Sequence, residues 1–74
     1  MNELLKKYIK DNNINLNCFK VNELSPFLVE LTDVNNHRLS LMNMFEDIIV
    51  YIDDKESGTY YFNNKMNLWL VKRG

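Results

Sequence analysis

The chain has 74 residues and a formal net charge of −1; 46% of its residues are hydrophobic and 26% are charged. This length predicts a single domain, residues 1–74, with a thin core, and this balance of apolar and charged residues argues against a disordered chain. The net charge argues against a nucleic-acid binder, because neutralising phosphates normally requires an excess of Lys and Arg.

A single cysteine, Cys18, excludes an internal disulfide. Leu4 and Leu5 are followed at once by two lysines, which leaves no secretory h-region, and no apolar run approaches the length that a bilayer requires. Alanine is absent and asparagine is the commonest residue, as expected of an A+T-rich genome. We therefore expect a cytoplasmic protein of a bacterial cell, encoded by a low-G+C bacterium, its phages or its plasmids.

Residues 2–11 predict an amphipathic helix. Asn2 suits the N-cap position, and Glu3 lies in the first turn, where the helix dipole favours an acid. The helix should end at residues 11–13, because Asp and Asn prefer caps and turns. Its apolar stripe recurs with helical spacing and consists of Leu4, Leu5, Tyr8 and Ile9.

Residues 14–21 alternate in polarity as far as Cys18, which predicts a short strand with a bulge near that residue. Residues 22–26 resemble a connection, and Pro26 must begin a strand or lie at a sheet edge because it has no amide to donate. Residues 26–37 then form the first half of the clearest hairpin in the chain.

The register of this hairpin follows from its side-chain pairing. A three-residue loop over residues 34–36, whose last residue is an Asn in the left-handed conformation, sets Leu31 opposite Leu39. A two-residue loop over residues 35–36 would set Leu31 opposite Ser40 instead. We favour the first register because it joins apolar to apolar residues. One face of its first strand carries Phe27, Val29 and Leu31.

Residues 40–47 fit either a helix, through apolar residues at helical spacing, or a strand. We favour a strand that ends near Met42 or Met44 and leads into a tight turn. Residues 48–52 are continuously β-branched or aromatic, which predicts a central strand covered on both faces. Residues 53–58 form a polar turn that closes on a glycine.

Residues 59–73 predict a second hairpin with residues 63–65 as a three-residue loop. This register sets Phe62 opposite Met66 and Thr59 opposite Trp69. The side toward the core then carries Tyr60, Phe62, Met66, Leu68 and Leu70. The other side carries Tyr61, Trp69 and Val71.

These elements predict an α+β fold, in which the N-terminal helix packs on a four- to five-stranded antiparallel meander sheet. One helix covers one face of such a sheet, and the second face stays at least partly wet. We expect Tyr61, Trp69 and Val71 on that second face, with Lys65 and Arg73 beside them, as a partner-binding surface. The alternative is that the helix, or the segment after it, covers this face.

No pattern in the chain predicts catalysis, a cofactor or a metal site. Residues 53–58 are acidic, but their carboxylates do not have the spacing of a calcium loop and no bidentate Glu follows. His37 lacks neighbouring ligand residues, and a dyad of Cys18 and His37 would need a third group and a pocket. We therefore expect a protein that is not an enzyme.

Two functions of different classes fit these features. The first is a non-enzymatic protein-binding module, such as a small phage- or mobile-element-encoded inhibitor of a bacterial protein. The alternative is a nucleic-acid-binding protein that stacks bases on the aromatic residues of the C-terminal hairpin. Acidic residues at 46–47 and 53–56 would oppose a polyanion nearby, or would attract a basic partner. We expect no membrane association, and homo-oligomerisation would help so small a domain.

Overall fold

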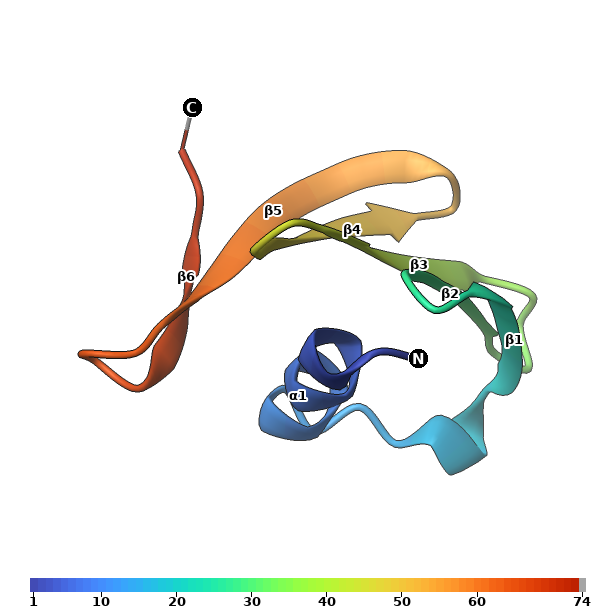
Figure 1. Cartoon of the computed structure of the whole chain (residues 1–74). Helices are drawn as coiled ribbons and strands as arrows, with labels where there is room; N and C mark the ends of the chain where they lie inside the picture. Colours follow the sequence, from blue (N-terminus) through green and yellow to red (C-terminus); the bar gives the residue numbers. More distant parts are fainter. Residues whose placement is uncertain (74) are drawn as a thin grey trace.

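One helical layer and one sheet make up the computed structural model, which describes residues 1–73 (Figure 1). Its elements are α1 (Glu3–Asp11), the 3₁₀ helix η1 (Leu16–Cys18), β1 (Lys20–Ser25), β2 (Leu28–Thr32), β3 (Arg38–Met44), β4 (Asp47–Ile52), β5 (Lys55–Asn63) and β6 (Leu68–Val71). Each strand pairs antiparallel with the next, in the order β1-β2-β3-β4-β5-β6. The α+β class and the meander are confirmed, but the sheet has six strands rather than four or five.

The segment after α1 folds differently from the prediction. The side-chain oxygen of Asn15 accepts a hydrogen bond from the backbone N–H of Asn17 at 3.0 Å, which starts a 3₁₀ turn in place of a strand. Strand β1 begins only at Lys20 and continues to Ser25, through residues that we expected to be a connection.

Helix α1 begins as predicted, with Asn2 as its N-cap. The Asn2 side-chain oxygen accepts a hydrogen bond from the Leu5 N–H at 2.9 Å. The sheet curves around α1, which lies on its concave side (Figure 1). The core between them consists of Leu5, Tyr8, Ile9, Val29, Leu31, Leu41, Ile48 and Val50. Each such side chain stabilises the fold by roughly 1.5–3 kcal/mol through its burial.

The predicted register between β2 and β3 is confirmed. Leu31 lies opposite Leu39, and Asn36 closes the loop with a φ of 66°. Residues 40–47 also follow the strand prediction, because β3 runs to Met44 and pairs there with Asp47 across a two-residue turn. One part of this region was predicted wrongly: Phe27, expected on the apolar face, is 55% exposed.

One further boundary differs from the expectation. The polar turn between β4 and β5 contains only Asp53 and Asp54, both with positive φ, and β5 starts at Lys55.

On the far side of the sheet from α1 lies a convex face, on which no other element of residues 1–73 packs (Figure 1). The concave face of the sheet is therefore covered by α1, whereas the convex face is not covered by another element.

Candidate partner-binding surfaces

The C-terminal hairpin has a different register from the predicted one. Its loop has four residues, 64–67, so that Asn63 pairs with Leu68 and Phe62 with Trp69. The Asn63 side-chain oxygen accepts a hydrogen bond from the Met66 N–H at 2.9 Å, and Asn67 closes the loop with a φ of 56°. Asn63 therefore acts as the last residue of β5 rather than as the first residue of the loop.

This shift of register reverses the expected faces of β6. Tyr61 now lies opposite Leu70 on the convex face, while Phe62 and Trp69 share the side that faces α1. The prediction that Trp69 and Val71 face away from the helix with Tyr61 was therefore wrong. Met66 and Leu68, expected in the core, are exposed. Trp69 is partly buried and packs against the core.

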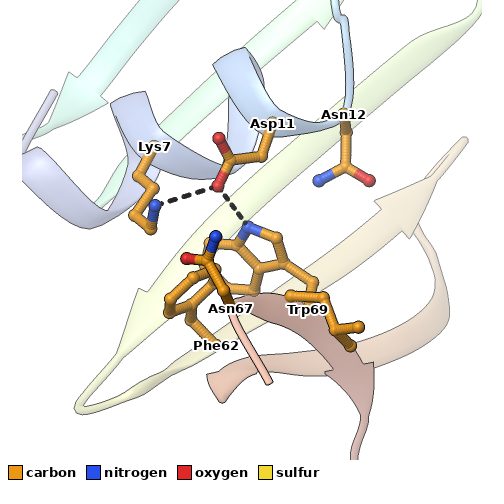
Figure 2. Close-up of a pocket in the computed structure, with 7 residues that line it drawn as sticks. Lys7, Asp11, Asn12, Phe62, Asn67 and Trp69 are labelled. Carbon is orange, nitrogen blue, oxygen red and sulfur yellow. Dashed lines mark hydrogen bonds and ion pairs between the residues drawn. The ribbon is translucent and has the colours of Figure 1, made fainter. Parts of the chain in front are cut away.

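Trp69 forms a latch between β6 and the last turn of α1 (Figure 2). Its ring meets the Tyr8 ring edge-on at a centroid distance of 5.0 Å, and its indole N–H donates to Asp11 Oδ2 at 3.0 Å. Lys7 Nζ lies 3.1 Å from the same carboxylate and 4.1 Å from the centroid of the Phe62 ring. The indole hydrogen bond, together with Lys7, lowers the pKa of Asp11.

A hollow of about 450 Å³ opens beside this latch (Figure 2). Its lining residues are Lys7, Asp11, Asn12, Phe62, Asn67, Leu68 and Trp69. The carboxylate of Asp11 is already bonded to both Lys7 and the indole. We therefore interpret this constellation as a structural clamp on the terminal hairpin.

The remaining residues of the predicted surface divide into two groups. Tyr61, Val71 and Arg73 line one hollow of about 500 Å³, together with Glu46, Asp47 and Lys72. Lys65 lies apart in the β5–β6 loop and is exposed. Lys72 Nζ is 2.8 Å from Asp47 Oδ2, and this contact raises the pKa of Lys72. The cations of this region thus lie among acids.

The acidic residues do not form one patch. Glu46 and Asp47 stand at the start of β4, whereas Asp53 and Asp54 stand at its end, so the length of the strand separates the two pairs. The second pair is engaged in local contacts, since Asp53 binds His37 and Asp54 binds Arg38. A continuous acidic surface for a basic partner is therefore absent from the part of the chain that the structure describes.

Three exposed apolar side chains lie at the end of the strands where the β1–β2 and β3–β4 turns are, whereas Val34 and Ile52 are exposed at the opposite end. We call Phe27, Met44 and Phe45 the turn edge. Phe45 is 94% exposed, Phe27 is 55% exposed and Met44 is 48% exposed. Sequence reasoning missed this surface because alternation of apolar residues assumes that they point inward. The signal available was the pair of phenylalanines at positions next to predicted turns.

Phe45 also has an unusual backbone conformation. Its φ is 55°, in a two-residue turn between Met44 and Asp47. Glycine, asparagine and aspartate normally occupy such positions, because a bulky side chain collides with its own backbone there. Phe45 gains almost no burial in return, so the fold itself does not explain why this residue is present.

Asn43 fixes the turn edge through four hydrogen bonds. Its backbone N–H donates to the Phe27 carbonyl at 2.8 Å, and its Nδ2 donates to the carbonyls of Phe45 and Asp47, both at 2.9 Å. Its Oδ1 accepts from Asn2 Nδ2 at 2.6 Å. Through its backbone N–H and its side chain together, Asn43 thus ties the backbones of both exposed phenylalanines to the N-terminus of α1.

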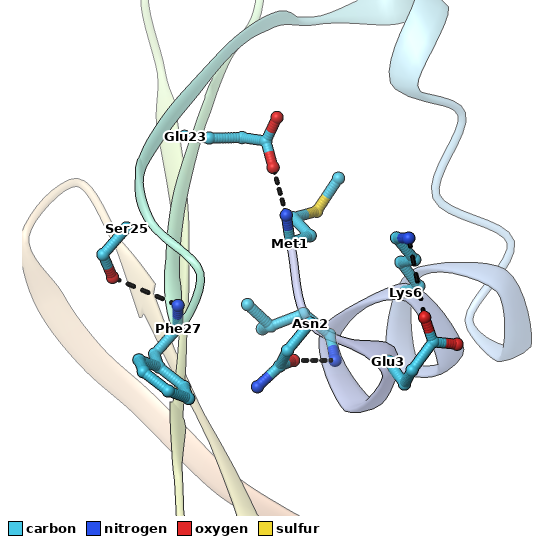
Figure 3. Close-up of polar contacts among 8 residues, drawn as sticks. Met1, Asn2, Glu3, Lys6, Glu23, Ser25 and Phe27 are labelled. Atoms are coloured by element: carbon cyan, nitrogen blue, oxygen red, sulfur yellow. Dashed lines mark hydrogen bonds and ion pairs between the residues drawn. The ribbon is translucent and has the colours of Figure 1, made fainter.

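Further contacts hold the first turn and the start of the chain (Figure 3). Phe27 N–H donates to Ser25 Oγ at 3.1 Å, and Asn2 N–H donates to the Pro26 carbonyl at 2.9 Å. The N-terminal ammonium of Met1 forms an ion pair with Glu23 and lowers the pKa of that carboxyl. Hydrogen bonds therefore fix both turns of the turn edge.

The opposite end of the sheet is polar. His37 Nδ1 lies 3.0 Å from Asp53 Oδ2, and this hydrogen bond raises the pKa of His37. The other carboxylate oxygen of Asp53 accepts from the Arg38 N–H at 2.9 Å. Within residues 1–73, no hydroxyl or thiol hydrogen-bonds to His37, and no cluster of three His, Cys, Asp or Glu residues could hold a metal. Cys18 is exposed in η1.

No protein-family model, curated protein or solved structure matches the chain. None of the helices described over residues 1–73 is long and apolar enough to cross a membrane. Functional inference therefore rests on the geometry of the surfaces that the fold leaves open.

Proposed function

We propose that the chain is a non-enzymatic protein-binding module that docks through the turn edge, with Phe45 as its anchor. The observation that carries this proposal is an aromatic side chain, 94% exposed, on a residue with a φ of 55°. Exposure of the ring costs solubility and the positive φ costs roughly 1–2 kcal/mol. Binding to a partner supplies the compensation that the isolated fold lacks.

The geometry specifies the chemistry of the partner. A single protruding ring fits a folded protein with an apolar pocket, because hot-spot residues are aromatic side chains that fill desolvated pockets. Glu46 follows Phe45 and is exposed, so a basic rim on that pocket would complement it. The hydrogen bonds of Asn43 hold both turns in advance, which lowers the entropy cost of docking.

The residues first predicted to bind a partner have unequal parts in this proposal. Tyr61, Val71 and Arg73 line the hollow that Glu46 also lines, so they are candidates for contacts at the rim of the docking surface. Trp69 and Lys65 are left out, because Trp69 belongs to the latch and Lys65 to the terminal loop. Inhibition of a bacterial protein, a phage origin and a cytoplasmic setting rest on size and composition alone.

Nucleic-acid binding is the less favoured function. Tyr61 does lie near Lys72 and Arg73, as a stacking platform would require. Glu46 and Asp47 line the same hollow, and Asp47 already neutralises Lys72. Phosphates would therefore meet as many acids as bases there, which removes the electrostatic attraction that such binding needs.

The test compares two exposed apolar residues at opposite ends of the sheet. The tagged chain, Phe45→Ala and Val34→Ala are each used to capture cross-linked proteins from the encoding organism, and the captured protein is then purified for calorimetry. Val34 is the matched control, since it is 95% exposed in the β2–β3 loop. We expect Phe45→Ala to weaken binding about 100-fold, and Val34→Ala to change it less than about twofold.

Circular dichroism establishes that both variants are folded. Equal affinities of Phe45→Ala and the unaltered chain would contradict the proposal. Fluorescence anisotropy with single- and double-stranded oligonucleotides covers the alternative, and affinity that falls steeply with added salt would support nucleic-acid binding instead.

A further inference from the structure

The sheet ends in two edge strands, β1 and β6, which differ in how well they are protected (Figure 1). Strand β1 has a bulge between Glu23 and Ser25 and carries charges at Lys20 and Glu23. Bulges and charged side chains are the usual means by which an edge strand avoids pairing with another chain. Strand β6 has neither, because its sequence is Leu-Trp-Leu-Val and its register with β5 does not shift. The edge of β6 is therefore open to a further strand.

The outer main-chain groups of β6 belong to Trp69 and Val71. The Lys72 N–H donates to the Thr59 carbonyl at 2.7 Å, which makes these two residues a hydrogen-bonded pair. Hydrogen-bonded and non-bonded pairs alternate along an antiparallel ladder, so Leu70 also bonds to β5, whereas the N–H and carbonyl groups of Trp69 and Val71 point away from it. No strand lies on that side in the part of the chain that the structure describes, so these groups have no backbone partner there.

This arrangement is complementary to itself about Leu70. A second copy of β6 can lie antiparallel beside the first, with the two Leu70 residues opposite each other. Each Trp69 then lies opposite the Val71 of the other copy. Both of these become hydrogen-bonded pairs, and each such pair exchanges two main-chain hydrogen bonds. Every outward donor and acceptor of Trp69 and Val71 is satisfied in this register.

The side chains fit the same register. On the side that faces α1, Trp69 would lie beside Val71 of the other copy, and aromatic residues pair favourably with β-branched residues across strands. On the convex face, the two Leu70 side chains form a non-hydrogen-bonded pair, in which side chains approach most closely. No like charges oppose each other, because Lys72 would lie opposite Leu68 of the other copy.

We propose that two copies of the chain pair through β6, antiparallel about Leu70, so that one sheet continues across a homodimer. Such an interface is isologous and uses the open edge of both copies. The edges that remain are the two β1 strands, whose bulge and charges discourage further pairing, so assembly stops at two chains. Because the interface consists of one short strand from each copy, we expect the dimer to dissociate on dilution.

The pairing uses no residue of the turn edge, since Phe27, Met44 and Phe45 do not belong to β6. Leu70, at the centre of the pairing, does not line the hollow at the rim of the docking surface. Docking and dimerisation can therefore fail separately, and each has its own variant.

Sedimentation velocity over a wide range of protein concentration tests the dimer, with charges placed at its centre. We expect the unaltered chain to approach twice the monomer mass at high concentration. Leu70→Lys and Leu70→Glu should each raise the dimer dissociation constant at least about tenfold, because like charges then oppose each other across the two-fold axis. An equimolar mixture of the two variants should associate more tightly than either variant alone, because opposite charges then meet. Phe45→Ala should leave the constant unchanged.

A disulfide trap tests the register, in chains whose native thiol is removed by Cys18→Ser. Opposing residues of a non-hydrogen-bonded pair have Cα atoms about 4.5 Å apart, within the range of a disulfide. Leu70→Cys should therefore form a covalent dimer in a glutathione buffer. Leu68→Cys is the matched control on the same face of β6. Its two copies would lie about 14 Å apart along the strands, so this chain should stay free of cross-links.

Circular dichroism establishes that each variant is folded. The proposal is wrong if the unaltered chain is a monomer at every concentration, or if the mixture of Leu70→Lys and Leu70→Glu associates no better than each variant alone. Equal cross-linking of Leu70→Cys and Leu68→Cys would reject the register. Loss of the dimer in Phe45→Ala would move the interface to the turn edge. A monomeric chain whose capture of a different protein is weakened by both charged variants would assign the β6 edge to a strand of that protein instead.

Discussion

The two ends of the sheet are built from different turn chemistry. At the polar end, the residues with positive φ are Asn36, Asp53 and Asp54, which tolerate that conformation. Carboxylates there accept backbone hydrogen bonds, as Asp33 does from Asn35 and His37. At the turn edge, the residue with positive φ is Phe45, which does not tolerate it and is exposed.

This difference separates residues that the fold requires, at the polar end, from a residue that the fold does not require, at the turn edge. The polar end needs no explanation beyond the fold, since every residue with positive φ there is an Asn or Asp, which suits that conformation, and its carboxylates accept hydrogen bonds within the two turns and between them. The turn edge breaks the local rule at Phe45 without gaining burial. Function is expected at a residue whose backbone conformation is unfavourable for its type and whose side chain is not buried in the fold.

The largest effect on stability should come from the residue that holds the turn edge. Asn43→Ala removes three side-chain hydrogen bonds and frees the Asn2 amide, so we expect it to lower the free energy of unfolding by about 2–3 kcal/mol. Urea unfolding followed by circular dichroism measures this change.

The same variant tests whether rigid presentation matters for binding. Asn43→Ala should also weaken partner binding, although the Phe45 ring is intact, because the turn must be ordered on docking. Asn43→Asp is the sharper control: it keeps the acceptor for Asn2 Nδ2 but cannot donate to the Phe45 and Asp47 carbonyls. If Asn43→Ala is destabilised but binds the partner with native affinity, a rigid turn is not needed for docking, and this claim is wrong.

A smaller effect should distinguish the two ends directly. Phe45→Gly relieves the strain of positive φ and should raise the free energy of unfolding by about 1 kcal/mol. Asn36→Gly, at the polar end, should change it by only a few tenths of a kcal/mol, because Asn already tolerates the conformation. Chemical denaturation of both variants gives the comparison. A loss of stability in Phe45→Gly would show that the ring supports the fold.

The smallest effect should be the pH dependence of the polar end. The hydrogen bond to Asp53 raises the pKa of His37 in the folded chain, so the protonated form favours folding. This stability is fully present below the unfolded pKa of about 6.5 and is lost as pH rises through the higher folded value. Unfolding curves from about pH 6 to about pH 8 should therefore decline slightly more in the native chain than in His37→Gln.

Other titrating groups are common to both chains and cancel in this difference. Identical pH profiles of the native chain and His37→Gln would mean that the contact between His37 and Asp53 contributes nothing measurable in solution.

The elements with local signals could be predicted from the sequence. Helix α1 has a suitable N-cap in Asn2 and an apolar stripe, and both act within a few residues. The β2–β3 register follows from a short loop and from apolar pairing across it, as between Leu31 and Leu39. The α+β class follows from these parts, because an apolar stripe on a helix and an apolar strand face must bury each other.

The register of the last hairpin could not be predicted from local preference. Asn63, Asn64 and Asn67 all suit a turn, so the sequence allows loops of different length there. The structure selects the register in which Trp69 reaches Asp11, a residue 58 positions earlier in the chain. The candidate surface was lost for the same reason, since its prediction depended on the face that Trp69 occupies.

The turn edge was missed because binary patterning treats every apolar residue as a core residue. Phe27 and Met44 continue the apolar content of their strands, and only tertiary structure reveals that Phe27 lies in the β1–β2 turn and that Met44 lies on the convex face, away from α1. Phe45 carries no local sign of exposure, apart from its position before two acidic residues.

The most direct test of the account is the affinity of Phe45→Gly for the purified partner, measured by calorimetry on protein whose unfolding free energy is determined in parallel. We predict a chain that is more stable than the native one and binds its partner about 100-fold more weakly, because the residue that strains the turn is the one that docks. A Phe45→Gly chain that is stabilised and still binds with native affinity would contradict the claim that Phe45 is kept for binding.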